Sequence, residues 1–236
     1  MKNITRKTLK IAVITAAVSA SLFFPFAAAT AATATEKTGV TTVSQADTAA
    51  AVVSVTSTAT QSSRSAGVFV GKGLVLVSNK IFEGAAKYYV TLADGRVIDA
   101  KVQHESLGLL FLQLVASEDL PTPVAVDATH QDTGANVAVF GLSDIRSHSH
   151  HPAMARGYIS APAFSFYSSA SEGPQLLSAK TDSEMDSKNL GPVFSRSESG
   201  GVSALIGMTV FNKDGESYFV AADFFKPIVK KLLAAI

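Results

Sequence analysis

The sequence predicts a mostly-β domain that closes as a barrel or sandwich and ends in a single helix. Short β-branched runs recur from residue 50 onward, and Gly, Pro, Asn and Asp separate them at close intervals. Two hairpin signals, ADGR at 93–96 and NKDG at 212–215, supply the positive φ angles that tight turns need. Many short strands favour a closed sheet, because closure removes unpaired edges.

The strand pattern fits a series of short segments along the folded part. They are 52–56, 67–70, 74–78, 88–92, 97–103, 109–115, 136–141, 155–159, 175–180, 192–194, 203–210 and 218–221. Helical spacing is found at 224–236, where one apolar face is formed by Phe224, Phe225, Ile228, Val229, Leu232 and Leu233. We place Pro227 in the first turn of this helix, where its missing N–H costs little.

The N-terminal segment predicts export. Lys2, Arg6, Lys7 and Lys10 precede an uncharged run at 11–35, so residues 1–30 fit a signal peptide with small residues at the cleavage site. The same run is long enough for an uncleaved anchor, which would give membrane contact. Either outcome predicts a periplasmic or cell-envelope location, and an anchor would hold the chain at the outer face of the cytoplasmic membrane. Residues 31–49 are predicted to be a flexible tether, and 50–236 the folded domain.

The composition excludes several classes of protein. Hydrophobic content is 47% and charged content 17%, so the chain can build a core and is not a disordered protein. It has no cysteine, which removes disulfides and thiolate chemistry. Beyond the four N-terminal basic residues, 16 basic face 19 acidic residues without a basic stripe, so we expect no nucleic-acid partner. We also expect no cofactor.

Several phrases, in their order and spacing, resemble the protease domain of HtrA-type, trypsin-like serine proteases. The phrases are SAGVFV at 65–70, GLVLVSN at 73–79, VTLADGR at 90–96, DAKV at 99–102, VAVFG at 137–141, RGYISA at 156–161 and FVAA at 219–222. The resemblance covers about 52–233. It implies a chymotrypsin-like double six-stranded β-barrel with a C-terminal helix. Because the sequence stops after that helix, we expect no PDZ domain.

The same alignment implies that all three triad positions are degenerate. Serine catalysis needs a hydroxyl, a neutral imidazole, a carboxylate and oxyanion donors. The family's histidine position matches Lys80, whose ammonium is ordinarily protonated at neutral pH and has no lone pair to accept a proton. Its aspartate position matches Gly108. Its nucleophile position matches Asn189 when counted back from Pro192, or Leu190 when counted forward from Asp182.

Other residues give weaker hypotheses. Ser187 with a neutral, buried Lys80 would make a rearranged Ser/Lys dyad. His148, His150 and His151 could bind a metal with help from other side chains, although a solvated loop explains them as well. These helpers would come from His104, His130, Asp144 or Glu172.

A run of aromatic residues raises the same choice between a binding role and a structural one. Phe164, Phe166 and Tyr167 fit either an exposed partner-contact patch or a strand with one face buried.

These observations predict a pseudoprotease rather than an enzyme. The expected function is protein binding, as an accessory or assembly subunit at the outer face of a bacterial membrane complex, respiratory or transport. Two alternatives remain: a peptide-binding module that uses the substrate cleft, and a residual serine hydrolase.

Overall fold

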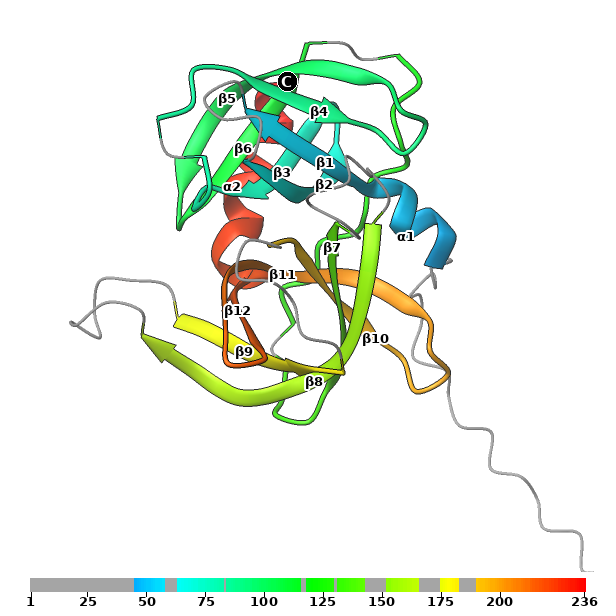
Figure 1. Cartoon of the computed structure of the whole chain (residues 1–236), viewed down its shortest axis with the longest axis vertical. Coiled ribbons are helices and arrows are strands. Elements are labelled where there is room, and N and C mark those ends of the chain that lie inside the picture. The colour runs from blue at the N-terminus through cyan, green and yellow to red at the C-terminus, as the bar shows by residue number, and fades with distance from the viewer. Residues whose placement is uncertain are drawn as a thin grey trace, which may run out of the picture. The chain divides into compact units, whose positions relative to one another are not determined.

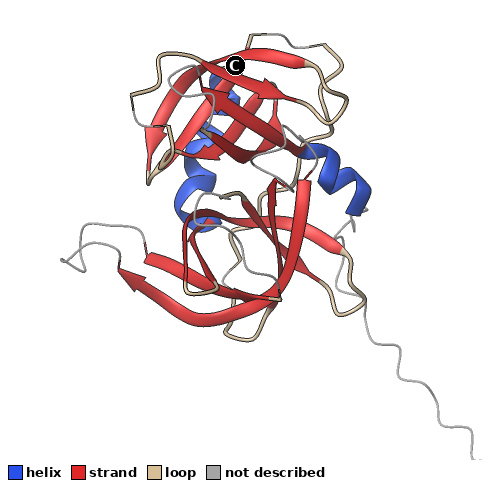
Figure 2. Ribbon diagram, in the orientation of Figure 1, coloured by secondary structure: helices blue, strands red, loops and turns tan. Residues whose placement is uncertain are grey.

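The described residues form two closed barrels of six antiparallel strands each (Figures 1 and 2). The first barrel contains β1 (Val52–Ser57), β2 (Arg64–Gly71), β3 (Leu74–Ser78), β4 (Tyr88–Thr91), β5 (Val97–Ser106) and β6 (Leu109–Leu114). The second contains β7 (Asn136–Leu142), β8 (Pro152–Ser165), β9 (Gln175–Thr181), β10 (Pro192–Arg196), β11 (Val202–Lys213) and β12 (Glu216–Ala221). The hydrogen-bonded orders are β1-β2-β3-β6-β5-β4 and β10-β11-β12-β9-β8-β7.

Two helices flank the strands, α1 (Gln45–Ala51) before β1 and α2 (Ala222–Ala235) after β12. The computed structural model describes residues 45–57, 63–82, 84–115, 118–129, 131–142, 152–165, 175–182 and 190–236, with the backbone alone at 161–165 and 175. All of them belong to one unit, Gly39–Ile236. The predicted signal peptide or anchor lies outside the described residues. Within the described part, neither helix is long and apolar enough to cross a bilayer.

The predicted strands are confirmed in number and order, and both hairpins form at the expected turns. Asp214 and Gly215 have φ of 53° and 77°, so the turn between β11 and β12 has two left-handed residues, as a type I′ hairpin requires. In the turn between β4 and β5, Gly95 has φ of 87° and its N–H donates to the Leu92 carbonyl at 3.0 Å. The turn chemistry therefore sets the register of both strand pairs.

Two boundary predictions are wrong. Helix α1 begins at Gln45, inside the predicted tether, and its Thr48 and Ala51 are buried because these small side chains pack beside β1 and β2. Helix α2 begins at Ala222, directly after β12, so Pro227 is its sixth residue and lies in the second turn. There the proline removes the helical hydrogen bond to the carbonyl of Asp223. The rest of α2 keeps its apolar face, with Phe225 and Val229 buried.

The core is continuous between the barrels. One cluster of buried side chains joins residues of the first barrel, such as Phe111, to Phe140 and Phe194 of the second and to Phe225 of α2. Phe140 and Phe194 meet edge to face, with ring centroids 5.3 Å apart. A smaller cluster fills the interior of the second barrel around Phe219.

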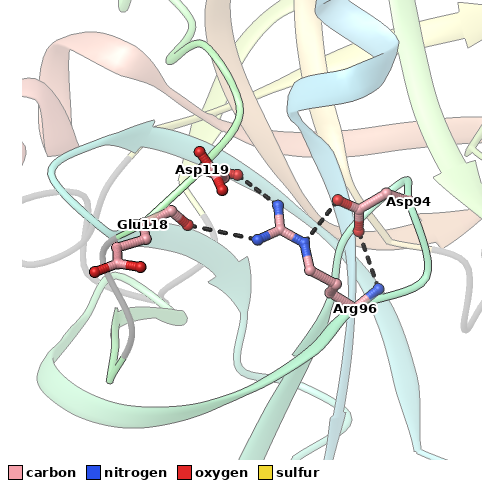
Figure 3. A network of polar contacts seen from close by, with 4 residues as sticks. All are labelled: Asp94, Arg96, Glu118 and Asp119. Atoms are coloured by element: carbon pink, nitrogen blue, oxygen red, sulfur yellow. Dashed lines mark hydrogen bonds and ion pairs between the residues drawn. The ribbon is translucent and has the colours of Figure 1, made fainter.

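The connection from β6 to β7 is bonded to both barrels. Arg96, after the β4–β5 turn, pairs with Asp94 at 2.7 Å and donates to the carbonyls of Glu118 and Asp119 (Figure 3). Its backbone N–H and side chain both hydrogen-bond the Asp94 carboxylate and lower the pKa of that group. Further along, the Asp127 N–H donates to the carbonyl of Leu205 in β11 at 2.9 Å. The connection therefore fixes the two barrels to each other.

Candidate functional site

Three successive residues of β11 lie beside the predicted triad positions. The Thr209 N–H donates to the Gly191 carbonyl at 2.9 Å, next to Leu190. A Cγ atom of Val210 lies 3.7 Å from where a Cβ on Gly108 would be. Phe211 lies under the ammonium of Lys80. The register of β11 against β12 shifts between Thr209 and Phe211, and such a bulge re-aims side chains. The fold therefore gathers these three positions around one short segment.

Gly108 is the second residue of the tight turn between β5 and β6. Leu107 and Gly108 have φ of 60° and 72° between the paired residues Ser106 and Leu109, so they form a two-residue turn of left-handed residues. The Gly108 carbonyl accepts the Asn79 N–H at 2.9 Å, which fixes this turn beside the end of β3. The position predicted for the orienting carboxylate is thus occupied by a residue without a side chain, next to buried Val210.

Lys80 forms one end of an aromatic stack that links the barrels. Its Nζ lies 5.5 Å from the centroid of the Phe211 ring, within the range of a cation–π contact. Phe211 stacks on Tyr218 with centroids 4.4 Å apart and planes 13° from parallel. The Tyr218 hydroxyl donates to Glu216 at 3.2 Å; burial raises the pKa of Tyr218, and this hydrogen bond raises it further. The lysine is exposed and faces an aromatic ring.

Leu190 is fully buried. Its carbonyl accepts two hydrogen bonds from β2, from the Ala66 N–H and from the Ser65 hydroxyl, both at 3.0 Å. Gly191 follows with almost no free space, because a Cβ there would lie 2.1 Å from the Phe140 carbonyl oxygen. The side chain at this position is therefore buried, and its backbone is bonded to β2 of the first barrel. Asn189, the other candidate for the nucleophile position, and Ser187 lie outside the described residues.

Comparison with solved structures places this arrangement in a known fold. Rv3671c from M. tuberculosis, as an inactive serine-to-alanine mutant, matches with a TM-score of 0.62 and 16% identity over 83% of this chain and 92% of that chain. The Rv3671c protease in an inactive form matches with a TM-score of 0.60 and 17% identity over 79% and 90%. The chain has a chymotrypsin-like fold. No family model and no curated protein matches the sequence.

The chymotrypsin-like fold confirms the predicted double barrel, while degeneracy of the triad stays a prediction. The other candidate residues are only partly placed. His148, His150, His151, Phe166 and Tyr167 lie outside the described residues, as do the proposed helper ligands His130, Asp144 and Glu172. The Phe164 backbone pairs with Leu176 in the β8–β9 ladder. His104 lies in β5 with its ring 5.6 Å from that of Phe111. Among the described residues, no group of three His, Asp or Glu side chains could hold a metal.

The described surface also contains a hollow that sequence reasoning missed. A cavity of about 430 Å³ lies on the first barrel between residues 85–89, 99–102 and Val115. Val102 and Val115 are exposed there, and burial, with Glu105 as a second cause, raises the pKa of Tyr88. None of the predicted triad positions lines it. The sequence predicted a strand at 97–103, but a strand pattern does not show how the sheet curves at that point.

Arg64 is a second feature without a sequence prediction. It begins β2, is only 7% exposed, and its Nε and Nη1 atoms are buried without a hydrogen-bond partner. In the sequence, the only sign of this buried charge was a single arginine at the start of the otherwise uncharged strand β2.

The Lys80–Phe211 contact predicts an energetic coupling between the barrels. Replacing Lys80→Met or Phe211→Leu removes one partner, and we expect a double-mutant cycle to give about 0.5–1 kcal/mol of coupling, as for an exposed cation–π pair. Urea denaturation of the four proteins measures it. Tyr218→Phe, which keeps the ring, is the control and leaves the coupling unchanged. Additive effects of the two substitutions would contradict the contact.

Proposed function

We propose that this chain is an exported, non-catalytic protein of chymotrypsin-like fold that binds a protein partner. In this proposal it acts as an accessory or assembly subunit at the outer face of a bacterial membrane complex, either a respiratory or a transport complex. The observation that carries the proposal is Leu190, a fully buried apolar residue at one of the two positions matched to the nucleophile. Export rests on the basic and apolar pattern of residues 1–30.

The neighbouring positions support the same proposal. Acyl transfer needs a base within hydrogen-bond reach of a nucleophile and a group that orients the base. Gly108 has no side chain to orient anything, and Lys80 points its ammonium at the Phe211 ring. In this proposal the triad positions contribute to turns and packing instead of catalysis. The protein would then act through its surface, by binding another protein. Protein binding is the function that uses that surface without any bond-making step.

Two measurements test the proposal together. Purified full chain is incubated with unfolded β-casein and with a serine-directed phosphonate, with active trypsin as positive control; we expect no cleavage and no label. Gently solubilised membranes are then used to purify the chain with its bound proteins, which mass spectrometry identifies. We expect a fixed set of membrane-complex subunits.

Each failure has its own meaning. Cleavage or labelling that Lys80→Ala abolishes would establish the residual hydrolase and overturn the non-catalytic proposal. A chain that purifies alone and monomeric in several mild detergents would overturn the subunit role. Saturable binding of extended apolar peptides, weakened by changes at Lys80 or Leu190, would favour the peptide-binding alternative.

A further inference from the structure

Arg64 is a charged group for which the described residues supply no counter-charge. Its side chain is 93% buried, and the Nε and Nη1 atoms have no hydrogen-bond partner. No ion pair among the described residues includes it. Burying a charge is costly unless the charge is paired and hydrogen-bonded, and a guanidinium stays charged at any physiological pH. An arrangement of this kind points to an anion that the described residues do not supply.

The strand register places hydroxyl groups beside this guanidinium. Thr56 of β1 pairs directly with Arg64, and Ser54 pairs with Ala66, so all four side chains lie on one face of the β1–β2 ladder. The Ser54 hydroxyl is also buried without a partner. The strands around it, β1, β2 and β4, contain no acidic residue. The face thus offers hydrogen-bond donors and one positive charge, and no carboxylate to receive them.

The same face lies against the segment matched to the nucleophile. Ala66, two residues after Arg64, donates its N–H to the Leu190 carbonyl. The Ala66 Cβ lies 2.9 Å from the place that a Cβ on Gly191 would occupy. Arg64 therefore shares a ladder face with Ala66, which packs against the segment that contains Leu190 and Gly191.

We infer that Arg64 is the anchor of a carboxylate-binding site for an acidic peptide segment of the protein partner. The planar guanidinium can form two parallel hydrogen bonds with a carboxylate, a geometry that a lysine ammonium lacks. Only 7% of the residue is exposed, so the ligand enters end-on, as a Glu or Asp side chain or a chain terminus. This inference deepens the proposed function, because it assumes that the chain binds a protein, and it supplies the chemistry of recognition.

Three short peptides test the site on the full chain. All are acetylated pentapeptides: one has a central glutamate and an amidated end, one has glutamine and an amidated end, and one has glutamine and a free C-terminal carboxylate. We expect the melting temperature of the wild-type chain to rise with either carboxylate peptide and to stay unchanged with the neutral one. The stronger of the two carboxylate responses identifies a side chain or a chain terminus as the ligand.

Substitutions separate binding from a structural role. Arg64→Met fills similar volume without charge, so we expect it to abolish the peptide response while the melting temperature without peptide stays equal or rises. Arg64→Lys keeps the charge but lacks the planar group that forms two parallel hydrogen bonds, and we expect peptide affinity to fall about ten-fold or more. Lys72→Met, which removes an exposed charge elsewhere, is the control and keeps the response.

Two results would overturn the inference. One is an equal wild-type response to the glutamate and glutamine peptides, a measurement that needs no variant to fold. The other is a lower melting temperature for Arg64→Met without peptide, which would mean that the guanidinium is paired within the chain. Co-purification from membranes with Arg64→Met distinguishes the two proposals: a retained partner leaves the proposed function standing and removes this site from it.

Discussion

Replacement of Gly191 by alanine is expected to strain the second barrel where β10 begins beside β7, and to weaken its packing against β2. The added methyl group would lie 2.1 Å from the Phe140 carbonyl oxygen and 2.9 Å from the Ala66 Cβ, distances that no Cβ tolerates. Because one obstacle is backbone of β7, the strain cannot be relieved by a rotamer change. We expect a loss of about 3 kcal/mol or more in unfolding free energy, and a fall of roughly 6–12 °C in melting temperature. Differential scanning calorimetry measures both.

Two further variants show whether backbone contact is the cause. Gly191→Ala combined with Ala66→Gly removes the side-chain clash and keeps the clash with Phe140, so we expect little recovery. Gly84→Ala adds a methyl group in open space at a φ of 75°, and we expect only the cost of that backbone conformation, about 1 kcal/mol. Full recovery in the double variant would contradict the close approach of β7.

Leu190→Ser is expected to destabilise the protein without creating a hydrolase. The substitution removes a fully buried aliphatic side chain and leaves a buried hydroxyl, for an expected loss of about 3–5 kcal/mol. No imidazole at Lys80 and no carboxylate at Gly108 are present to activate the new hydroxyl. Urea denaturation measures the stability, and a fluorogenic peptide assay measures hydrolysis.

Leu190→Met is the matched control, because it conserves volume and apolar character. We expect it to cost less than about 1.5 kcal/mol. If Leu190→Ser and Leu190→Met lowered the unfolding free energy equally, the burial of Leu190 would not contribute to stability. Hydrolysis above the level of the Met variant would show that the site still holds a working base.

Local sequence patterns, namely apolar runs bounded by turn residues, were sufficient to predict the strands. The runs at 74–78 and 109–115 are continuous β-branched and leucine stretches between turns, and they pair with each other as β3 and β6. The hairpin at Asp214-Gly215 is a local property of two residues. The ends of β8, β11 and β5 extend beyond their apolar runs, because ladder hydrogen bonds continue through polar residues whose burial depends on neighbours.

Tertiary contacts decided the rest. Seven residues of α1 contain no helical apolar period, and only packing of Thr48 and Ala51 beside the first barrel makes them a helix. Counting along the chain left Asn189 and Leu190 as equal candidates for the nucleophile position, and residue type did not decide which of them occupies it. The burial of Arg64 without a hydrogen-bond partner depends on which side chains face it in the fold. Residue type alone would predict that an arginine is exposed.

Helix α2 affects the order in which the chain can become folded during synthesis. It begins at the end of β12 in the second barrel, yet its Leu233 carbonyl accepts the Lys72 ammonium at 2.9 Å, and the Leu233 side chain packs at Gly71. Phe225 and Val229 belong to the same buried cluster as the first barrel. The first barrel is encoded entirely before residue 115, but part of the apolar surface that completes it is translated last. An emerging chain therefore exposes that surface until the helix arrives, and would need it shielded until then.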